Sequence, residues 1–330
     1  MSFRALRVIE TSAGKFERSI AEREIDDLPA GEVLIKVKYS SLNYKDALSA
    51  TGNKGITKKF PHTPGIDAAG VVEISRNSNF ATGEEVIVTG YDLGMNTDGG
   101  MAEYIRVPGN WIVPKPAEYS LKECMIIGTA GFTAALALYK MQLLGQLPSD
   151  GPIVVTGSTG GVGSVAVAIL AKAGYDVIAI TGKTQASEYL HHLGATKIQS
   201  REFVNDQSGK ALLKPKWSGA IDTVGGNTLT TLLKACKLEG CIASTGLVDS
   251  PDINTTVYPF ILNGVNLVGI GSAETPMEKR QAIWGLLSED WNIKDKLPVI
   301  AKEVTLDDLN NTYIDGILQG KMMGRILIKI

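Results

Sequence analysis

Residues 153–174, with the sequence IVVTGSTGGVGSVAVAILAKAG, give the clearest indication of the fold class. This segment begins with a short apolar run, residues 153–156, and continues into a loop in which residues 157, 160, 161 and 163 are glycine. Residues 162–173 are helical in composition, and Gly174 follows them where a helix C-cap is expected. A strand, a glycine-rich loop and a helix in this order are typical of a βαβ unit whose loop binds phosphate groups.

The glycines of this loop suit a pyrophosphate. Gly160 turns the chain where a side chain would clash, Gly161 leaves backbone N–H groups open, and Gly163 lets the helix pack closely on the sheet. The helix N-terminus offers the anion unpaired N–H groups and a favourable dipole. Ser158 replaces the first glycine of the strict G-x-G-x-x-G motif. The loop therefore predicts a nucleotide site, with a plain tight turn as the alternative.

The residues after the next apolar run, 177–180, distinguish the two nicotinamide dinucleotides. NAD sites usually carry an acidic residue about 20 residues after the glycine motif, where it accepts the ribose 2′-hydroxyl. Here Thr181 and Lys183 follow the run, and no acid occurs before Glu188. A lysine and a hydroxyl suit a 2′-phosphate. The sequence therefore predicts NADPH, unless Lys183 is merely a solvated loop lysine.

Outward from this unit, the chain has a β-rich first third and an α/β middle. Period-2 or short apolar patterns separated by turn residues predict strands over residues 32–42, 69–74, 85–89, 102–107 and 111–113. Beyond a helical stretch at 121–144, apolar runs alternate with helical patterns at 177–180, 185–193, 220–224, 229–235, 241–244 and 265–270. Such alternation predicts a parallel sheet with right-handed crossovers. The last segment, from about residue 276, has two helical patterns and a final strand pattern at 325–330, so the first domain is expected to be discontinuous.

Composition excludes several classes of partner. The chain has 330 residues, with 33 Lys and Arg against 35 Asp and Glu, for a net charge of -2. This balance gives no field that favours nucleic acid or an anionic membrane, so a small-molecule substrate is expected. The three cysteines lack C-x2-C spacing, no uninterrupted apolar stretch would span a membrane, and the N-terminus is charged. We therefore expect a cytoplasmic protein.

Residues that would do chemistry by themselves are few. The three histidines are His62, in a loop, and His191 and His192, on a polar helical stretch. The cysteines lie on helix and strand patterns, where core packing is expected. Neither a G-x-S-x-G motif nor a zinc-ligand cluster is present in the sequence. We expect no metal, and a bound cofactor that carries the reaction.

Several segments together resemble one superfamily. They are LNYKD (residues 42–46), PGIDAAG (64–70), GTAGFT (128–133), GGVG (160–163), AIDTVG (220–225), VYPFIL (257–262) and GRILIKI (324–330). With the β-rich start, they resemble the medium-chain dehydrogenase/reductase superfamily over essentially the whole chain. Within it, the chain is similar to the zinc-free quinone oxidoreductase branch, and most similar to the acryloyl-CoA reductase group.

The resemblance implies an α/β protein with a GroES-like β-rich catalytic domain and a doubly wound parallel-sheet (Rossmann) domain. The expected domains are residues 1–122, an NADPH-binding domain over 123–272, and a return segment, 273–330, that completes the first. The active site would lie in the cleft between the domains. Residues 43–46 and 65–67 stand where zinc-dependent relatives have metal ligands. A homodimer is implied, with residues 266–270 as the edge strand that pairs across a two-fold axis.

The resemblance also implies the cofactor contacts. Tyr44 and residues of the glycine loop would contact the dinucleotide, a second group would hold its 2′-phosphate end, and a third would contact the ribose and nicotinamide. These residues are Tyr44; Thr159, Gly160, Gly161 and Val162; Thr181, Gly182, Lys183 and Arg201; and Leu247, Ile261, Ser272 and Gln319.

The implied reaction is NADPH-dependent reduction of the C=C bond of a short enoyl-CoA such as acryloyl-CoA. Tyr44 is the candidate catalytic residue, either orienting substrate or cofactor or packing against the nicotinamide without chemistry. Asp67 is expected to brace its loop. Lys54, Lys58 and Lys59 are candidates for the CoA phosphates, with a solvated charged surface as the alternative. The alternatives to this function are an NADPH:quinone oxidoreductase and a non-catalytic NADPH-binding module.

Overall fold

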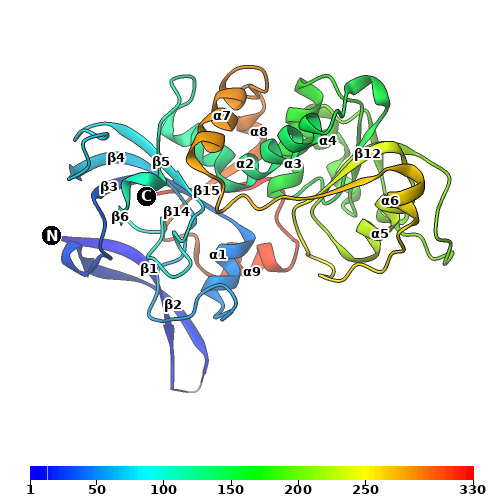
Figure 1. Ribbon diagram of the computed structural model, residues 1–330. Helices are drawn as coiled ribbons and strands as arrows, with labels where there is room; N and C mark the ends of the chain where they lie inside the picture. The colour runs from blue at the N-terminus through cyan, green and yellow to red at the C-terminus, as the bar shows by residue number, and fades with distance from the viewer. Residues whose placement is uncertain (13) are drawn as a thin grey trace. The chain divides into compact units, whose positions relative to one another are not determined.

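The chain folds into two compact units, which are described separately. The structure, a computed structural model, describes residues 1–12 and 14–330 (Figure 1). Unit 1 consists of Met1–Thr129, Ala273–Ala282 and Ile300–Ile330. Unit 2 consists of Ala130–Ser272 and Ile283–Val299. The division of the chain into domains at residues 122 and 272 stays a prediction.

Unit 1 contains a seven-stranded sheet and a separate hairpin. The sheet has the order β14-β15-β3-β4-β5-β7, with β6 also paired to β3. All its pairs are antiparallel except β14–β15. Two further strands, β1 and β2, pair antiparallel with each other. The strands are β1 (Ser2–Glu10), β2 (Phe16–Glu24), β3 (Val33–Leu42), β4 (Asp67–Ser75), β5 (Glu85–Thr89), β6 (Tyr104–Val107), β7 (Ile112–Pro114), β14 (Ala301–Thr305) and β15 (Arg325–Lys329).

Unit 2 is built on six parallel strands in the order β10-β9-β8-β11-β12-β13. The strand order reverses beside β8, which has β9 on one side and β11 on the other. Ligands bind at such a switch point, beyond the carboxyl ends of the strands. The prediction of an α/β protein with a doubly wound parallel sheet is confirmed. The strands are β8 (Ile153–Val155), β9 (Val177–Ile180), β10 (Lys197–Gln199), β11 (Trp217–Asp222), β12 (Cys236–Ser244) and β13 (Asn266–Gly269).

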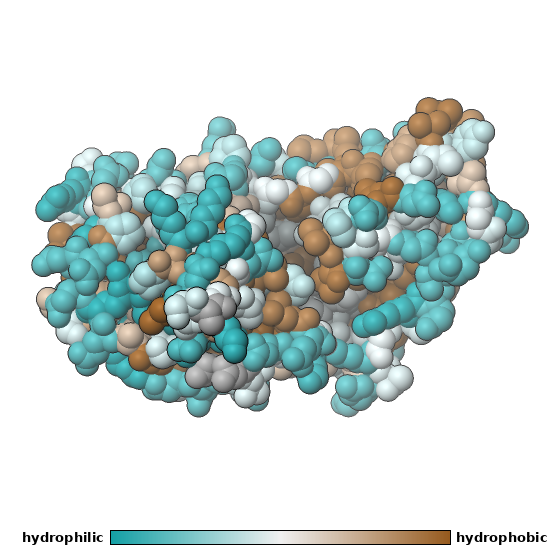
Figure 2. All heavy atoms as spheres, turned by 90° about the horizontal axis from the view of Figure 1, so that it is seen from below, coloured by the Kyte–Doolittle hydropathy of each residue, from teal (hydrophilic) through white to brown (hydrophobic). Residues whose placement is uncertain are grey.

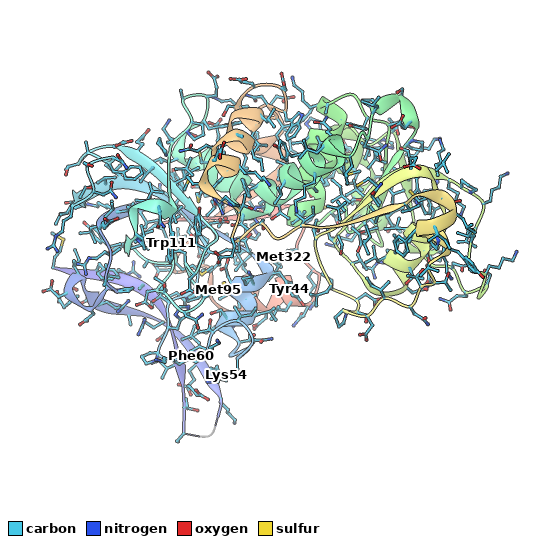
Figure 3. All side chains as sticks on the ribbon, viewed as in Figure 1. Tyr44, Lys54, Phe60, Met95, Trp111 and Met322 are labelled. Atoms are coloured by element: carbon cyan, nitrogen blue, oxygen red, sulfur yellow. The ribbon has the colours of Figure 1, made fainter. Side chains whose placement is uncertain are left out.

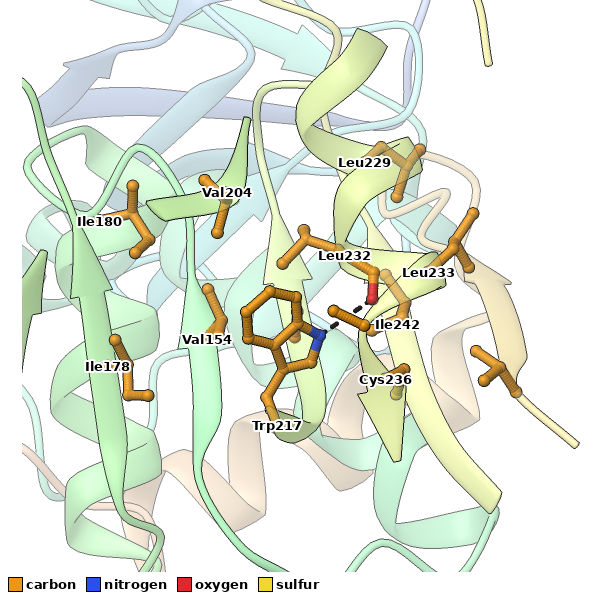
Figure 4. Packing of buried hydrophobic residues seen from close by; sticks show 13 residues of the cluster. Val154, Ile178, Ile180, Val204, Trp217, Leu229, Leu232, Leu233, Cys236 and Ile242 are labelled. Atoms are coloured by element: carbon orange, nitrogen blue, oxygen red, sulfur yellow. Dashed lines mark hydrogen bonds between the residues drawn. The ribbon is translucent and has the colours of Figure 1, made fainter. Parts of the chain in front are cut away.

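Trp217 is at the centre of one core of unit 2. Its side chain is fully buried among aliphatic residues of the sheet and of α5 (Figure 4). The indole Nε1 donates a hydrogen bond of 2.9 Å to the carbonyl of Leu232. The one polar atom of this large side chain is therefore satisfied where it is buried, as its burial requires. The helices of this unit include α3 (Gly161–Lys172), α4 (Ser187–Leu193), α5 (Gly226–Lys234) and α6 (Tyr258–Asn263).

Among the residues that the structure describes, one helix, α2 (Leu121–Leu143), is long and apolar enough to cross a membrane, but 83% of its apolar window is buried inside the protein. It is therefore a core helix by burial. Gly128 interrupts it with a φ of 49° and a ψ of -159°, a backbone conformation that favours glycine. The remaining helices are α1 (Tyr44–Ala50), α7 (Met277–Ser288), α8 (Leu297–Ile300) and α9 (Asn310–Leu318).

Candidate cofactor site and active site

The glycine loop lies at the carboxyl end of β8, at the switch point of the sheet, and α3 begins at its end. A Cβ on Gly163 would lie 2.2 Å from the carbonyl oxygen of Gly157, so a side chain there would collide with backbone. Gly157 itself has a φ of 55°. These two glycines hold the loop tightly against the first turn of α3, as a pyrophosphate-binding turn requires.

Ser158 explains why the strict glycine motif is not needed here. Its Oγ donates to the carbonyl of Val155 at 2.6 Å and accepts from the N–H of Ile180 at 2.8 Å. Its own N–H donates to the carbonyl of Ile180 at 3.1 Å. The serine thus ties the end of β8 to the end of β9, where a glycine could supply only its backbone.

The predicted phosphate contacts meet at the first turn of α3. Gly160 is its N-cap, and Gly161 and Val162 are its first residues. The N–H groups in a first helical turn have no acceptor within the helix, and the helix dipole adds partial positive charge. Thr159 is buried beside them. This arrangement fits a bound pyrophosphate.

A pair of cations lies beyond β9, at the same edge of the sheet. Thr181 directly follows β9, and its N–H donates to the carbonyl of Gln199, the last residue of β10. Arg201 crosses Gly182 so closely that a Cβ there would lie 2.8 Å from its Nε. Burial and the neighbouring Arg201 lower the pKa of Lys183. Two cations that repel each other at this place fit an anion such as a 2′-phosphate.

Three further predicted contacts belong to unit 2. Leu247 is 61% exposed and lines a cavity of about 260 Å³ beyond the carboxyl ends of β11 and β12. Ile261 lies on α6 and is 68% exposed. The hydroxyl of Ser272 accepts a hydrogen bond of 2.8 Å from Thr133. Both apolar side chains are therefore available to a ligand.

Two predicted contacts belong to unit 1. Tyr44 is the first residue of α1 and is 38% exposed (Figure 3). Gln319 follows α9 as its C-cap residue and is exposed. Helices α1 and α9 contact each other. The structure thus places these two residues at the ends of two helices that contact each other, although the sequence separates them widely.

Behind Tyr44 lies a buried polar group that we call the Arg325 cluster: Ser41, Asn43, Asp46, Asp67 and Arg325. Asp67 accepts hydrogen bonds from Ser41 Oγ at 2.6 Å and from Asn43 Nδ2 at 2.8 Å. The guanidinium of Arg325 donates to Ser41 Oγ at 2.6 Å and to Asn43 Oδ1 at 2.9 Å. Burial and the nearby Asp67 carboxylate raise the pKa of Asp46 to about 7.

Asp67 also binds the interrupted helix α2. Its two carboxylate oxygens accept from the Thr129 N–H at 2.9 and 3.0 Å, and Oδ1 accepts from the Thr129 hydroxyl at 2.7 Å. These bonds cap the part of α2 that follows Gly128. The sequence indicated that Asp67 braces its loop, but it gave no indication that Arg325 lies beside it.

The Arg325 cluster does not fit a metal ion. A guanidinium already contributes the positive charge there, and it is bound by the oxygens of Ser41, Asn43 and Asp67. Within residues 1–12 and 14–330, no group of three or more His, Cys, Asp or Glu side chains is placed to hold a metal. The donor set therefore suits an arginine rather than a zinc ion.

His62 and the three cysteines are buried inside the protein. His62 is buried, its Nε2 lies 2.9 Å from the carbonyl of Gly94, and burial lowers its pKa. All three cysteines are free and buried, and burial raises their pKa to about 12. They are therefore packed thiols that ionise poorly near neutral pH.

The three lysines of the expected CoA-binding cluster differ in their surroundings. Lys54 forms an ion pair with Glu10 at 2.5 Å, and its Nζ lies 4.8 Å from the ring centre of Phe60 (Figure 3). Its charge is already compensated. Lys58 and Lys59 are exposed, so they are the better candidates for a phosphate.

Comparison with known proteins agrees with this architecture. The profile of the alcohol dehydrogenase GroES-like domain matches residues 29–117, and that of the zinc-binding dehydrogenase family matches residues 161–289. Acrylyl-CoA reductase AcuI of Ruegeria pomeroyi is 39% identical over 97% of both chains. A Bacillus subtilis protein provisionally named quinone oxidoreductase YhfP is 45% identical over 99% of both chains.

Solved structures agree as well. The yhdH oxidoreductase of Salmonella enterica, crystallised with NADP, is 43% identical and has a TM-score of 0.95 over 100% of both chains. Bacillus subtilis yhfP, crystallised with NAD, is 45% identical and has a TM-score of 0.96 over 100% of both chains. The chain therefore belongs to the medium-chain dehydrogenase/reductase superfamily of oxidoreductases, in the group that contains acrylyl-CoA reductase AcuI and YhfP.

Proposed function

We propose that the protein uses NADPH to reduce the C=C bond of a short enoyl-CoA such as acryloyl-CoA. The observation that carries the cofactor assignment is the cation pair of Lys183 and Arg201 beside the phosphate-binding loop. The similarity to acrylyl-CoA reductase AcuI supports the substrate class. When bound, NADPH supplies the hydride that reduces the β-carbon of the thioester.

The protein's own residues bind and orient. The first turn of α3 would hold the pyrophosphate, and Thr181, Gly182, Lys183 and Arg201 would hold the 2′-phosphate. Tyr44 has two candidate roles. Its hydroxyl holds the water that protonates the α-carbon, or its ring packs against the nicotinamide without chemistry. A Tyr44→Phe variant separates the two, since only the first role requires the hydroxyl.

The alternative acceptor is a quinone, supported by the name of the YhfP relative. The deciding experiment follows NADPH oxidation with acryloyl-CoA and, in parallel, with a small quinone. A much larger kcat/KM for acryloyl-CoA supports the proposal, and a preference for the quinone replaces it. NADPH binding without turnover of either acceptor leaves a non-catalytic NADPH-binding module.

The proposal extends to assembly and location. We infer a homodimer, because β13 forms an outer edge of the parallel sheet and an unpaired edge favours association. Exposed apolar side chains are frequent in the same part of the chain, and Figure 2 shows that hydrophobic residues reach the surface of the protein in patches. The exposed apolar side chains include Leu247, Val248, Ile253, Val257, Tyr258, Ile261, Leu262 and Leu267. A cytoplasmic location also stays a proposal.

A further inference from the structure

The guanidinium of Arg325 joins three separate segments of unit 1. Arg325 is 2% exposed, although it carries a charge. Its Nε donates to the carbonyl of Ile126 at 3.1 Å, in the first part of α2. Its Nη1 donates to the carbonyl of Leu42 at 3.3 Å, at the end of β3, and its Nη2 lies 3.4 Å from Asp67 on β4. One side chain of the last strand thus fixes the surroundings of α1.

Asn43 carries this constraint to the helix. Its Oδ1 accepts from Arg325, and its Nδ2 donates to Asp67. Its backbone N–H donates to Asp46 Oδ2 at 2.8 Å, and the other oxygen of Asp46 accepts from the Ile66 N–H at 2.8 Å. The residue after Asn43 is Tyr44. The side chain and the backbone N–H of Asn43 are therefore held by hydrogen bonds, directly before the candidate catalytic residue in the chain.

Helix α1 depends on such external support. It has seven residues, and isolated helices shorter than about 12 residues are marginal in water. Its first turn is set by the capping interaction between Asn43 and Asp46, and this capping pair is itself held by Arg325 and Asp67. A buried ion pair contributes little net stability compared with apolar packing. The arrangement is therefore better explained by the orientation that it imposes.

We propose that Arg325 is a positioning residue for Tyr44: acting through Asn43 and Asp67, it sets the direction in which α1 presents the tyrosine. The proposal rests on the proposed function, because it assumes that Tyr44 contacts cofactor or substrate. Arg325 itself would contact neither cofactor nor substrate. It stabilises one orientation of the first turn of α1, so its loss should act only through Tyr44.

The test is a double-mutant cycle with Arg325→Lys, Tyr44→Ala and the combined variant. Lysine keeps the buried charge but lacks the fork that reaches three segments at once. We expect Arg325→Lys to lower kcat for acryloyl-CoA, or to raise the Kd for NADPH, by about tenfold. In the Tyr44→Ala background the same substitution should change neither quantity. Equal factors in both backgrounds would mean a merely structural role and would overturn the proposal.

Two further variants keep the result interpretable. Asn43→Ala leaves Asp67 and Arg325 in place and should reproduce the cycle if Arg325→Lys does not fold. Asp98→Asn is the matched control, because Asp98 pairs with Arg7 at 2.9 Å and Arg23 at 2.6 Å elsewhere in unit 1. It should lower Tm without any coupling to Tyr44.

The readouts also separate this proposal from the proposed function. If acryloyl-CoA is not reduced, the proposed reaction fails, and the cycle measured on NADPH Kd by fluorescence titration still decides the role of Arg325. If Tyr44→Ala has wild-type Kd and wild-type turnover, nothing remains for Arg325 to position, and the proposal is wrong.

Discussion

The Oγ of Ser158 accepts a hydrogen bond of 2.8 Å from the backbone N–H of Ile180, and so joins the cofactor loop to the end of the neighbouring strand β9. The residues immediately beyond Ile180 are those that would bind the 2′-phosphate. Ser158 therefore connects the two parts of the chain that we propose to bind phosphate, through a side chain that a glycine would lack.

Replacing Ser158 tests this connection. Ser158→Ala leaves the buried N–H of Ile180 without its acceptor, which should cost about 1–3 kcal/mol of unfolding free energy. Because the loop loses its side-chain tie to β9 and keeps only the backbone bond from residue 158 to the carbonyl of Ile180, the Kd for NADPH should also rise. Calorimetry and fluorescence titration measure the two effects.

Ser218→Ala is the matched control for this serine. Ser218 is also buried, and its hydroxyl donates to the carbonyl of Gly151 at 2.9 Å, at the opposite end of the sheet. It should lower stability slightly and leave NADPH affinity unchanged. A Ser158→Ala variant with wild-type NADPH affinity would argue against the connection.

The sequence predicted those parts of the fold whose signal is local. Strand β3 reads VLIKVKYSSL, with apolar residues alternating against lysines, and it was predicted within one residue of its bounds. The hairpin β1–β2 and the strand β14 were not predicted individually. Strand β2 reads FERSIAERE, which has no regular alternation of apolar and polar residues to indicate a strand. In agreement with this composition, none of its residues is fully buried.

At the candidate site, too, only the residues with a local sequence signal could be predicted. The glycine loop and Lys183 could be predicted because each lies within one short segment. The Arg325 cluster combines residues 41–46, 67 and 325, which meet only after β3, β4 and β15 have formed one sheet. The segment GRILIKI (residues 324–330) contributes to the family resemblance, but nothing in it shows that the side chain of Arg325 is buried, so its role required the topology.

The cation pair makes a prediction about cofactor choice. Lys183→Ala and Arg201→Ala should each raise the Kd for NADPH by about tenfold or more, since each removes a charge-assisted contact to the 2′-phosphate. NADH lacks this phosphate, so its Kd should change little. Fluorescence titration with both dinucleotides measures the difference.

Lys197→Ala is the control for the loss of one positive charge, because Lys197 is exposed on β10 at the other end of the strand. It should bind both dinucleotides as the wild type does. If the two site variants weakened the binding of NADH as strongly as that of NADPH, the cation pair would not recognise the 2′-phosphate.

Because His62 is buried, we expect the protein to lose stability in mild acid. Burial lowers its pKa below the ordinary 6.5, so the unfolded chain takes up the proton first as the pH falls. The stability that is present above pH 6.5 is therefore lost as the pH falls through this value towards the lower folded pKa. The raised pKa of Asp46 has the opposite effect on stability: the folded state binds this proton more tightly than the unfolded chain, so protonation of Asp46 stabilises the folded state as the pH falls.

Variants isolate the histidine contribution. His62→Gln should be about 1–3 kcal/mol less stable than the wild type at mildly alkaline pH, and this difference should shrink below pH 6.5. His192→Gln, at an exposed position on α4, is the control for the loss of an imidazole at the surface. Urea unfolding at a series of pH values measures both. A His62→Gln difference that stays constant with pH would contradict the assignment.

The proposed dimer can be tested at β13. Leu267 lies on this edge strand and is 37% exposed. Leu267→Lys would place a charge in a paired edge and should shift the protein towards monomer in sedimentation velocity. Leu143→Lys changes another exposed leucine, at the end of α2, and should leave the assembly unchanged. A wild-type protein that sediments only as a monomer would exclude the dimer.

The exposed lysines after α1 allow a test of substrate choice. Lys58 and Lys59 are exposed, whereas Lys54 is already paired with Glu10. If Lys58 and Lys59 contact the phosphates of CoA, the Lys58→Gln/Lys59→Gln variant should raise KM for acryloyl-CoA several-fold. The reason is that each exposed charge pair contributes about 0.2–1 kcal/mol to binding. Its KM for a quinone, which has no phosphate, should be unchanged. Lys54→Gln should affect stability and leave both KM values as they are. Because exposed charges are screened, added salt should reduce the difference between wild type and the double variant. Equal changes in KM for both acceptors would show that these lysines belong to a solvated surface and do not recognise CoA.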